Sequence, residues 1–316
     1  MYFPEFSITN SILKNIGKIE ASRALIEHTP IQPTLLNKIE KEAEFKNIYY
    51  SNLFEGDSPK YEEAKKYYDG MMPSSDRRFR NLENYDKTLH KAYSFSKISE
   101  DLIKSLHNEL LTDIAPKEKT GSYRNIAFLV KGTNNYSPSP DEILASLRSF
   151  FSWFDEDDAK DLPVPIRCAI LYFEIYRIQP FEIGTKKIAG IITLFNLFIE
   201  KYDLYKLVSI EKYFSDNPTT FHDAVRSTQN AEGDITKWVE YFLSGLSDEF
   251  EAIKDRVISL SKDSKILKIA GMKPLNDRQE KIVEFLHDYG NIQNKDFERL
   301  LPTVSEDSIL RDLKDL

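Results

Sequence analysis

Two strongly apolar segments lie close together in the middle of the chain. Residues 165–178 (PIRCAILYFEIYRI) repeat apolar side chains every three or four positions, which is the period of a packed helix. Residues 186–202 (KKIAGIITLFNLFIEKY) are apolar on nearly every side as far as Glu200, as in a helix that is buried all round. The pattern therefore predicts two core helices joined by one short, exposed turn, within residues 177–190 (RIQPFEIGTKKIAG).

Shorter apolar repeats predict further helices on both sides of this pair. Pro30 and Pro33 separate the first two helices, and Gly56 supplies a stop for the second. Asp141 is the expected N-cap of a later helix, and residues 71–80 (MMPSSDRRFR) are expected to form an irregular loop. The helical pattern covers residues 11–49, 82–93, 100–111, 142–154 and 249–269.

The stretch from 112 to 140 departs from the helical period. Glycine, asparagine and proline interrupt short β-prone pieces such as residues 126–130. This composition predicts a small β-hairpin, whose exposed edge could hold an extended peptide by strand addition.

The last part of the chain has the rhythm of a winged-helix module. Helices are predicted at 278–289, 295–301 and 305–316, and the sequence stops before any wing strands. Residues 274–316 contain ten acidic and six basic side chains. Because a surface that binds phosphates should be basic, we expect protein contact or dimerisation here rather than nucleic-acid binding.

The turn resembles the active-site loop of the Fic (Fido) family, whose members transfer AMP or a related phosphoryl-containing group from a nucleotide to a protein hydroxyl. The family pattern is His-Pro-Phe-x-Asp/Glu-Gly-Asn-Gly-Arg-x-x-Arg. Residues 179–190 of this chain read QPFEIGTKKIAG, so that Pro180, Phe181 and Gly184 match.

Three other stretches, in the family's order, support the resemblance. Residues 51–56 (SNLFEG) are similar to the Ser-x-x-x-Glu-Gly inhibitory helix, residues 121–140 to the hairpin flap over the target peptide, and residues 209–246 to the closing helices. The resemblance implies a mainly α-helical fold with a Fic-type helical core and a β-hairpin flap. The expected domains are an N-terminal helical region (1–95), the Fic core (96–246), a linker helix (247–273) and the winged-helix-like module (274–316).

The altered positions predict impaired protein AMPylation. Gln179 stands at the position of the family's histidine base, and an amide cannot accept the proton of the attacking hydroxyl. Ile183 replaces the acidic residue that holds Mg²⁺, which argues against Mg²⁺ here. Lys187 and Gly190 replace the two arginines. Since these groups act on one transition state, their joint loss should leave little catalysis.

Binding of an anion needs fewer groups. Gly184 gives the turn conformational freedom, Thr185 can cap the following helix, and Lys186 and Lys187 add positive charge near its N–H groups. We therefore expect Gly184 to Lys187 to bind an anion, with ATP or another nucleotide as the implied ligand. A plain alternative is that both lysines are merely solvated at a helix start.

The resemblance also implies an inhibitory contact between the glutamate helix and the loop, called the brake below. In the family, the glutamate of the inhibitory helix pairs with the last arginine of the loop, a position that is Gly190 here. Ser51 and Glu55 are therefore the expected regulatory residues, with Lys186 or Lys187 as substitute cation. The alternative is a helix end with a solvated acid.

The composition of the chain limits the cellular location of the protein and the kinds of binding site that it can hold. Charged residues make up 30% of the chain, no apolar run is long enough for a membrane span, and no secretory signal is visible, so a cytoplasmic location is expected. Cys168 is the only cysteine and lies in an apolar helix. We interpret His90 and His107 as structural and predict no metal site, because no carboxylate or second histidine was recognised at ligand spacing. The net charge of −8 disfavours non-specific electrostatic binding to nucleic acid.

Three functions remain open on this evidence. The first is an impaired Fic protein, a pseudoenzyme that binds an anion, nucleotide or peptide as a regulatory module, with a target peptide at the flap and a homodimer as possible assemblies. The second is an active nucleotidyl or phosphoryl transferase with a shifted mechanism, for which Glu182 is the nearest carboxylate. The third is a transcriptional regulator that senses a small ligand.

Overall fold

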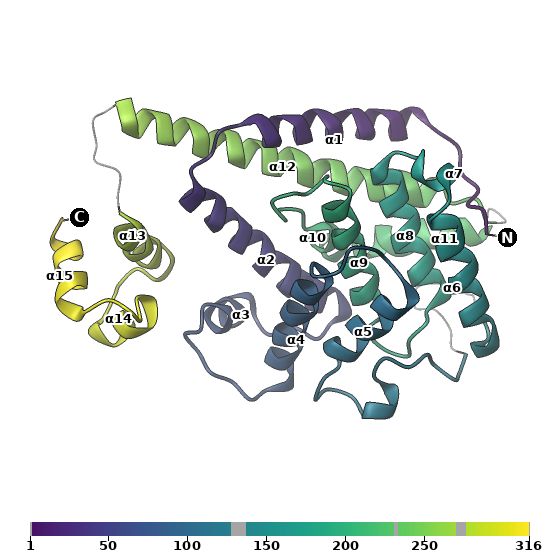
Figure 1. Cartoon of the computed structure of the whole chain (residues 1–316), viewed down its shortest axis with the longest axis horizontal. Coiled ribbons are helices and arrows are strands. Elements are labelled where there is room, and N and C mark those ends of the chain that lie inside the picture. Colours follow the sequence, from purple (N-terminus) through teal and green to yellow (C-terminus); the bar gives the residue numbers. More distant parts are fainter. Residues whose placement is uncertain (1, 128–136, 231–232, 270–275, 316) are drawn as a thin grey trace.

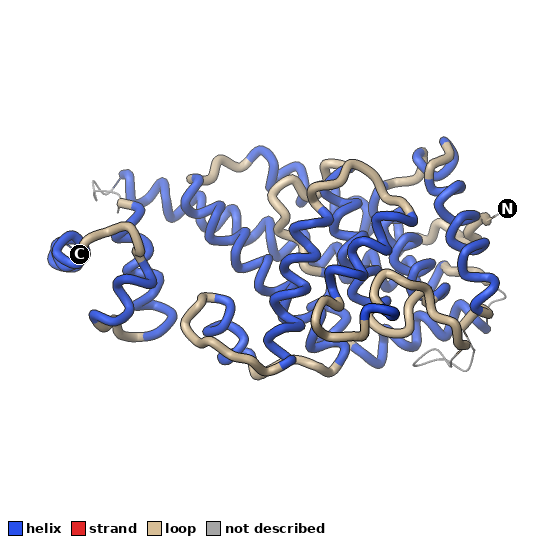
Figure 2. Tube along the Cα trace, turned by 60° about the horizontal axis from the view of Figure 1, so that its bottom comes forward, coloured by secondary structure: helices blue, strands red, loops and turns tan. Residues whose placement is uncertain are grey.

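The computed structural model describes residues 2–127, 137–230, 233–269 and 276–315. Helices form the regular structure of these ranges, and the only β pairing in them is an isolated bridge between Glu5 and Asp234 (Figure 2). The predicted mainly α-helical fold is confirmed. The β-hairpin was predicted within residues 112–140; residues 112–127 and 137–140 contain no strand, and residues 128–136 lie outside the described ranges. The elements are α1 (Asn10–His28), α2 (Pro33–Glu55), α3 (Tyr61–Tyr68), α4 (Arg77–Ala92), α5 (Glu100–Leu110), η1 (Lys117–Lys119, a 3-10 helix), α6 (Pro140–Phe154), α7 (Asp157–Lys160), α8 (Val164–Ile178), α9 (Thr185–Ile199), α10 (Ile210–Asp216), α11 (Pro218–Asn230), α12 (Thr236–Ile269), α13 (Asp277–Tyr289), α14 (Asn294–Leu300) and α15 (Glu306–Asp315).

The two helices predicted to form the core, α8 and α9, do so. They pack on each other; α6 and α12 also contact α8, and α2, α4 and α5 contact α9 (Figure 1). Trp238 of α12 is fully buried and donates its indole N–H to the carbonyl of Ala169 in α8, at 2.7 Å. Other helices thus pack against both α8 and α9.

The first helix lies along the long helix α12 (Figure 1). Thr9 Oγ1 donates to Glu240 at 2.7 Å, and Lys18 pairs with Glu251 at 2.7 Å. Helix α12 runs without a break from the end of the predicted closing segment into the predicted linker helix. The expected domain boundary at 246/247 therefore falls inside one helix.

Two helix starts differ from the sequence prediction, and in both cases a capping side chain gives the reason. Asp76 accepts a hydrogen bond from the Arg78 N–H, so α4 begins inside the segment predicted to be an irregular loop. Ser139, rather than Asp141, is the N-cap of α6, in a capping box with Glu142.

The three C-terminal helices are confirmed and have an apolar cluster of their own, made of Ile282, Phe297, Leu301 and Ile309. Residues 276–315 contain helices only, so the winged-helix assignment is not confirmed. Across the described ranges, none of the helices combines the length and apolarity that crossing a bilayer requires.

Candidate functional site

The site is built around the bend from α8 to α9. Helix α8 ends at Ile178, and Gln179 follows in the left-handed conformation with φ = 47°. Gly184 precedes α9 with φ = 78°, where a Cβ would be strained and would lie 3.2 Å from Leu110. Two left-handed residues thus make the tight turn between two helices that are buried over almost their whole length.

A buried arginine holds this bend. The Arg124 side chain is 4% exposed and donates to the carbonyls of Gln179 at 2.6 Å and Ile178 at 3.3 Å. It also donates to the carbonyls of Ile126 at 2.7 Å and Pro138 at 2.6 Å. Since carbonyls at a helix C-terminus have no intrahelical partner, Arg124 satisfies the end of α8 and also fixes the chain at Ile126 and Pro138.

His107 of α5 supports the bend from the opposite side. Its Nε2–H donates to the Ile183 carbonyl at 3.0 Å, while Nδ1 accepts from the Gly121 N–H at 2.9 Å. The imidazole stacks on Phe181 with ring centroids 3.7 Å apart. A ring that donates at one nitrogen and accepts at the other is neutral. Burial lowers the pKa of His107 to about 4, which agrees with its interpretation as structural.

The depressed pKa of His107 predicts acid sensitivity. Below the ordinary value of 6.5 the unfolded chain binds a proton that the folded chain excludes, so stability falls as pH drops from 6.5 towards 4. The expected loss from this group is about 3 kcal/mol of unfolding free energy. In urea unfolding at pH 4 to 7, His107→Gln should not show this loss of unfolding free energy, whereas the control His28→Gln, at an exposed position, should follow the parent. Parallel curves for parent and His107→Gln would contradict it.

The first turn of α9 faces the end of α2. Lys187 Nζ lies 3.1 Å from Glu55 Oε2, and the two side chains are 7% and 22% exposed. Lys186 Nζ donates to the Phe54 carbonyl at 3.2 Å and lies 3.9 Å from the centroid of the Phe54 ring. Both lysines are therefore engaged by the last residues of α2, and neither is simply solvated.

Thr185 has a different role from the predicted one. Gly184 is the N-cap of α9, and no side chain caps that helix start. Thr185 Oγ1 instead accepts from the Phe181 N–H at 3.3 Å and donates to the Phe181 carbonyl at 3.1 Å. The positive end of α9 thus lacks a capping acceptor, as in a helix start that binds anions.

Comparison with known proteins identifies this arrangement. Residues 97–197 match the family model described as Fic/DOC. A Fic family protein from Desulfovibrio desulfuricans is similar with a TM-score of 0.71 and 16% identity, over 99% of this chain and 92% of that one. A Fic domain containing signaling protein from Bacteroides thetaiotaomicron has a TM-score of 0.63 and 20% identity, over 78% of this chain and 98% of that one. Fic-1 (residues 134–508) from C. elegans has a TM-score of 0.65 and 18% identity, over 80% of this chain and 73% of that one. No curated protein sequence matches.

Residues 97–197 are thus similar to a Fic/DOC domain, and the fold of the chain is that of Fic structures. The loop that resembles the Fic motif lies where the sequence predicted, between two core helices. Gln179, at the position of the family's histidine, has 9% of its surface exposed, and Ile183, at the acidic position, has 41% exposed. An aliphatic side chain gives a hard cation no oxygen ligand, so the loop does not fit Mg²⁺ at this position. Glu182, the alternative carboxylate, is paired with Lys119 at 2.7 Å.

The two expected regulatory residues stand one turn apart at the end of α2 but make different contacts. Glu55 is the last residue of α2, before Gly56 with φ = 83°, and meets the loop lysine. Ser51 is 2% exposed and donates to the Ile48 carbonyl at 3.1 Å. The structure thus brings Glu55 together with Lys186 and Lys187, while the Ser51 hydroxyl bonds within its own helix.

The sequence prediction missed Glu211 of α10. A Cβ on Gly190 would lie 2.0 Å from Glu211 Oε1, so this carboxyl fills space beside the last position of the Fic motif. Glu211 is 1% exposed, and Oε1 has no hydrogen-bond partner in the described part of the chain. Burial raises its pKa to about 8, a rise that Lys186 and Lys187 partly oppose and Glu55 adds to. The sequence feature that could have pointed to this contact was Gly190, a glycine inside an otherwise apolar helix.

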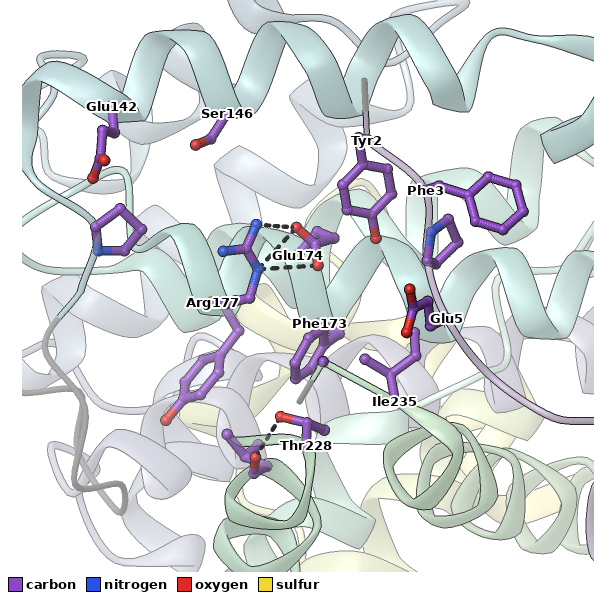
Figure 3. A pocket seen from close by; sticks show the side chains of 15 residues that line it. Tyr2, Phe3, Glu5, Glu142, Ser146, Phe173, Glu174, Arg177, Thr228 and Ile235 are labelled. Atoms are coloured by element: carbon purple, nitrogen blue, oxygen red, sulfur yellow. Dashed lines mark hydrogen bonds and ion pairs between the residues drawn. The ribbon is translucent and has the colours of Figure 1, made fainter. Parts of the chain in front are cut away.

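A cavity of about 570 Å³ lies at the C-terminal end of α8, against the N-terminal segment (Figure 3). On its wall Arg177 forms a two-pronged ion pair with Glu174, with the closest contact at 2.6 Å. Tyr2 points its hydroxyl towards Glu174. The pKa of Tyr2 is raised mainly by burial and, to a smaller extent, by the negative charge of Glu174. The residues of the Fic loop do not line this cavity. Sequence analysis gave no sign of it, because its wall joins distant segments.

Proposed function

We propose that this Fic domain is impaired in AMPylation and acts as a regulatory module that binds a nucleotide or a related phosphate-bearing anion. The observation that supports the proposal best is the Glu55–Lys187 pair at the uncapped start of α9. A glutamate in this place competes with an anionic ligand for the same cation. The proposed resting state is therefore closed by α2, and a ligand must displace Glu55 to bind.

The chemistry of the loop supports the loss of transfer activity. Loss of a positioned base alone costs about 10² to 10⁴ in rate. Ile183 cannot hold Mg²⁺, and the remaining carboxylate of the loop, Glu182, is committed to Lys119. We infer that ATP, if bound, is held by Lys186, Lys187 and the N–H groups of the first turn without a metal bridge. A target peptide beside residues 126–140, a homodimer and a cytoplasmic location belong to the same proposal.

The proposal predicts that Glu55→Ala raises the affinity for ATP by at least about tenfold, a change of about 1.4 kcal/mol, because Lys187 loses its competitor. Isothermal titration calorimetry with and without Mg²⁺ measures this, and the affinity should not depend on Mg²⁺. Glu182→Gln is the matched control, since it removes a carboxylate of the same loop that pairs with a different lysine, and it should bind like the parent.

Two results would contradict the proposal. One is an unchanged ATP affinity in Lys187→Met, which would place the ligand elsewhere. The other is transfer of label from radioactive ATP to lysate proteins by the parent chain that Lys187→Met abolishes, which would favour the active transferase with a shifted mechanism. Restoring His, Asp, Asn, Gly and Arg at positions 179, 183, 185, 186 and 187 provides the positive control for that assay.

A further inference from the structure

Three side chains that bind metals in other proteins converge between α2 and α4, away from the Fic loop. Glu44 comes from α2, and Asp86 and His90 stand one turn apart on α4. One potential ligand atom of each lies within 4.8 Å of the other two. This corrects the sequence analysis, which did not recognise Asp86 as a carboxylate at ligand spacing from His90.

The orientation of the imidazole suits a metal ligand. His90 Nδ1 lies 3.1 Å from the Asp86 backbone carbonyl and 3.1 Å from Asp86 Oδ1, so a proton on Nδ1 is held by these oxygens. Nε2 then carries a lone pair and faces Glu44 Oε2 at 3.6 Å. A tetrahedral ion about 2.1 Å from each ligand requires ligand atoms about 3.4 Å apart. An imidazole whose other nitrogen is fixed by a backbone carbonyl is the usual arrangement at metal sites.

The carboxylates are placed to receive a positive charge as well. Asp86 Oδ1 is closed off from solvent and lacks a hydrogen bond of good geometry in the described part of the chain, although it lies 3.1 Å from His90 Nδ1. The other carboxylate is that of Glu44. Its Oε1 accepts a hydrogen bond from the Tyr68 hydroxyl at 2.7 Å, and its Oε2 faces His90. Glu44, Tyr68 and Asp86 also line a cleft of about 980 Å³, which gives an ion a path of entry.

We propose that Glu44, Asp86 and His90 bind a divalent transition-metal ion of the Zn²⁺ class, which ties α2 to α4. One imidazole and two carboxylates match the ligand preferences of Zn²⁺, with a fourth position left for water. Mg²⁺ is not the expected ion, because it has little preference for imidazole. Helix α2 ends in Glu55, so an ion at Glu44 would stiffen the helix that carries the proposed brake. The ion site itself does not depend on the proposed nucleotide binding.

The test is a calorimetric Zn²⁺ titration of the full chain after treatment with EDTA, together with the thermal unfolding midpoint. We expect one Zn²⁺ per chain and a midpoint that rises with Zn²⁺ concentration. Loss of an outer partner of a metal ligand typically weakens binding by 10- to 100-fold. Tyr68→Phe should therefore weaken Zn²⁺ by roughly tenfold, and His90→Gln and Glu44→Gln by more than about 100-fold.

The matched control is His28→Gln. His28 is exposed at the end of α1, and its Nδ1 lies 2.8 Å from the carbonyl of Ala24, so it has the same backbone contact without the two converging carboxylates. Its Zn²⁺ affinity should equal that of the parent. Cys168 is fully buried and cannot supply an adventitious thiolate. Absence of Zn²⁺ binding in the parent would overturn the proposal. So would binding that survives His90→Gln, or Mg²⁺ binding as tight as that of Zn²⁺.

Discussion

Replacing Glu211 with glutamine is expected to stabilise the protein at alkaline pH by up to about 5 kcal/mol. The pKa of this buried carboxyl is raised from 4.5 to about 8. Between these values the folded chain keeps a proton that the unfolded chain has released, so folding stability is complete below pH 4.5 and declines as pH rises towards 8. Glutamine has no proton to lose and should remove this decline.

Urea unfolding at pH 5, 7 and 9 measures the effect. Parent and Glu211→Gln should have similar unfolding free energies at pH 5 and differ most at pH 9. Glu62→Gln, at an exposed position of α3, serves as a control and should stay within about 0.5 kcal/mol of the parent at each pH. Parallel pH profiles for parent and Glu211→Gln would show that Glu211 is already ionised in the fold.

The state of Glu211 bears on the proposed ligand. A carboxyl with a pKa of about 8 is neutral at pH 7. It then cancels none of the positive charge of Lys186 and Lys187, which lie close enough to lower its pKa. In the part of the chain described, Glu55 is the carboxylate that contacts Lys187, so a single displacement would open the cation to an anion.

The second large effect is expected from Arg124→Met, which should lower the free energy of unfolding by about 3 to 5 kcal/mol. Methionine fills a similar volume but leaves the carbonyls at the end of α8 and on both sides of the flap segment without their donor. A buried carbonyl that loses its donor destabilises the fold by its full desolvation free energy, because it no longer has a hydrogen bond to replace the one it made to water. Urea unfolding at pH 7 measures the loss.

Arg78→Met is the matched control for this variant. The Arg78 side chain is 47% exposed and pairs with Asp76 at the start of α4. Exposed pairs of this kind contribute little, so the control should unfold almost as the parent does. An equally small loss in Arg124→Met would mean that water can replace the guanidinium at the bend.

The sequence was most informative where local pattern decides structure. The period of three and four residues located α8 and α9 to within one residue at the inner ends, Ile178 and Thr185, because both helices are buried and tolerate few polar positions. Gly56 stops α2 as predicted, in the left-handed conformation. The sequence also named two candidate cations for Glu55, and the geometry selects Lys187 as the ion-pair partner.

Contacts between distant segments could not be predicted in this way. The Arg124 side chain reaches carbonyls 54 and 55 positions further along the chain, and no local period encodes that distance. Glu211 looks like an ordinary acidic residue at a helix start until Gly190 of another helix is placed beside it. Asp86 and His90 stand one turn apart on α4, a spacing that the sequence prediction overlooked, and their third partner, Glu44, becomes apparent only when α2 packs on α4.

The pairing of α1 with α12 has a consequence for synthesis in the cell. Thr9 and its partner Glu240 are 231 residues apart, so at about 5 to 20 residues per second the first helix emerges from the ribosome roughly 10 to 50 s before its partner. During that interval Ile12, Ile19 and Ile26, which are buried in the finished fold, face water or a chaperone. We therefore expect nascent chains stalled before residue 236 to be far more prone to aggregate than the released protein.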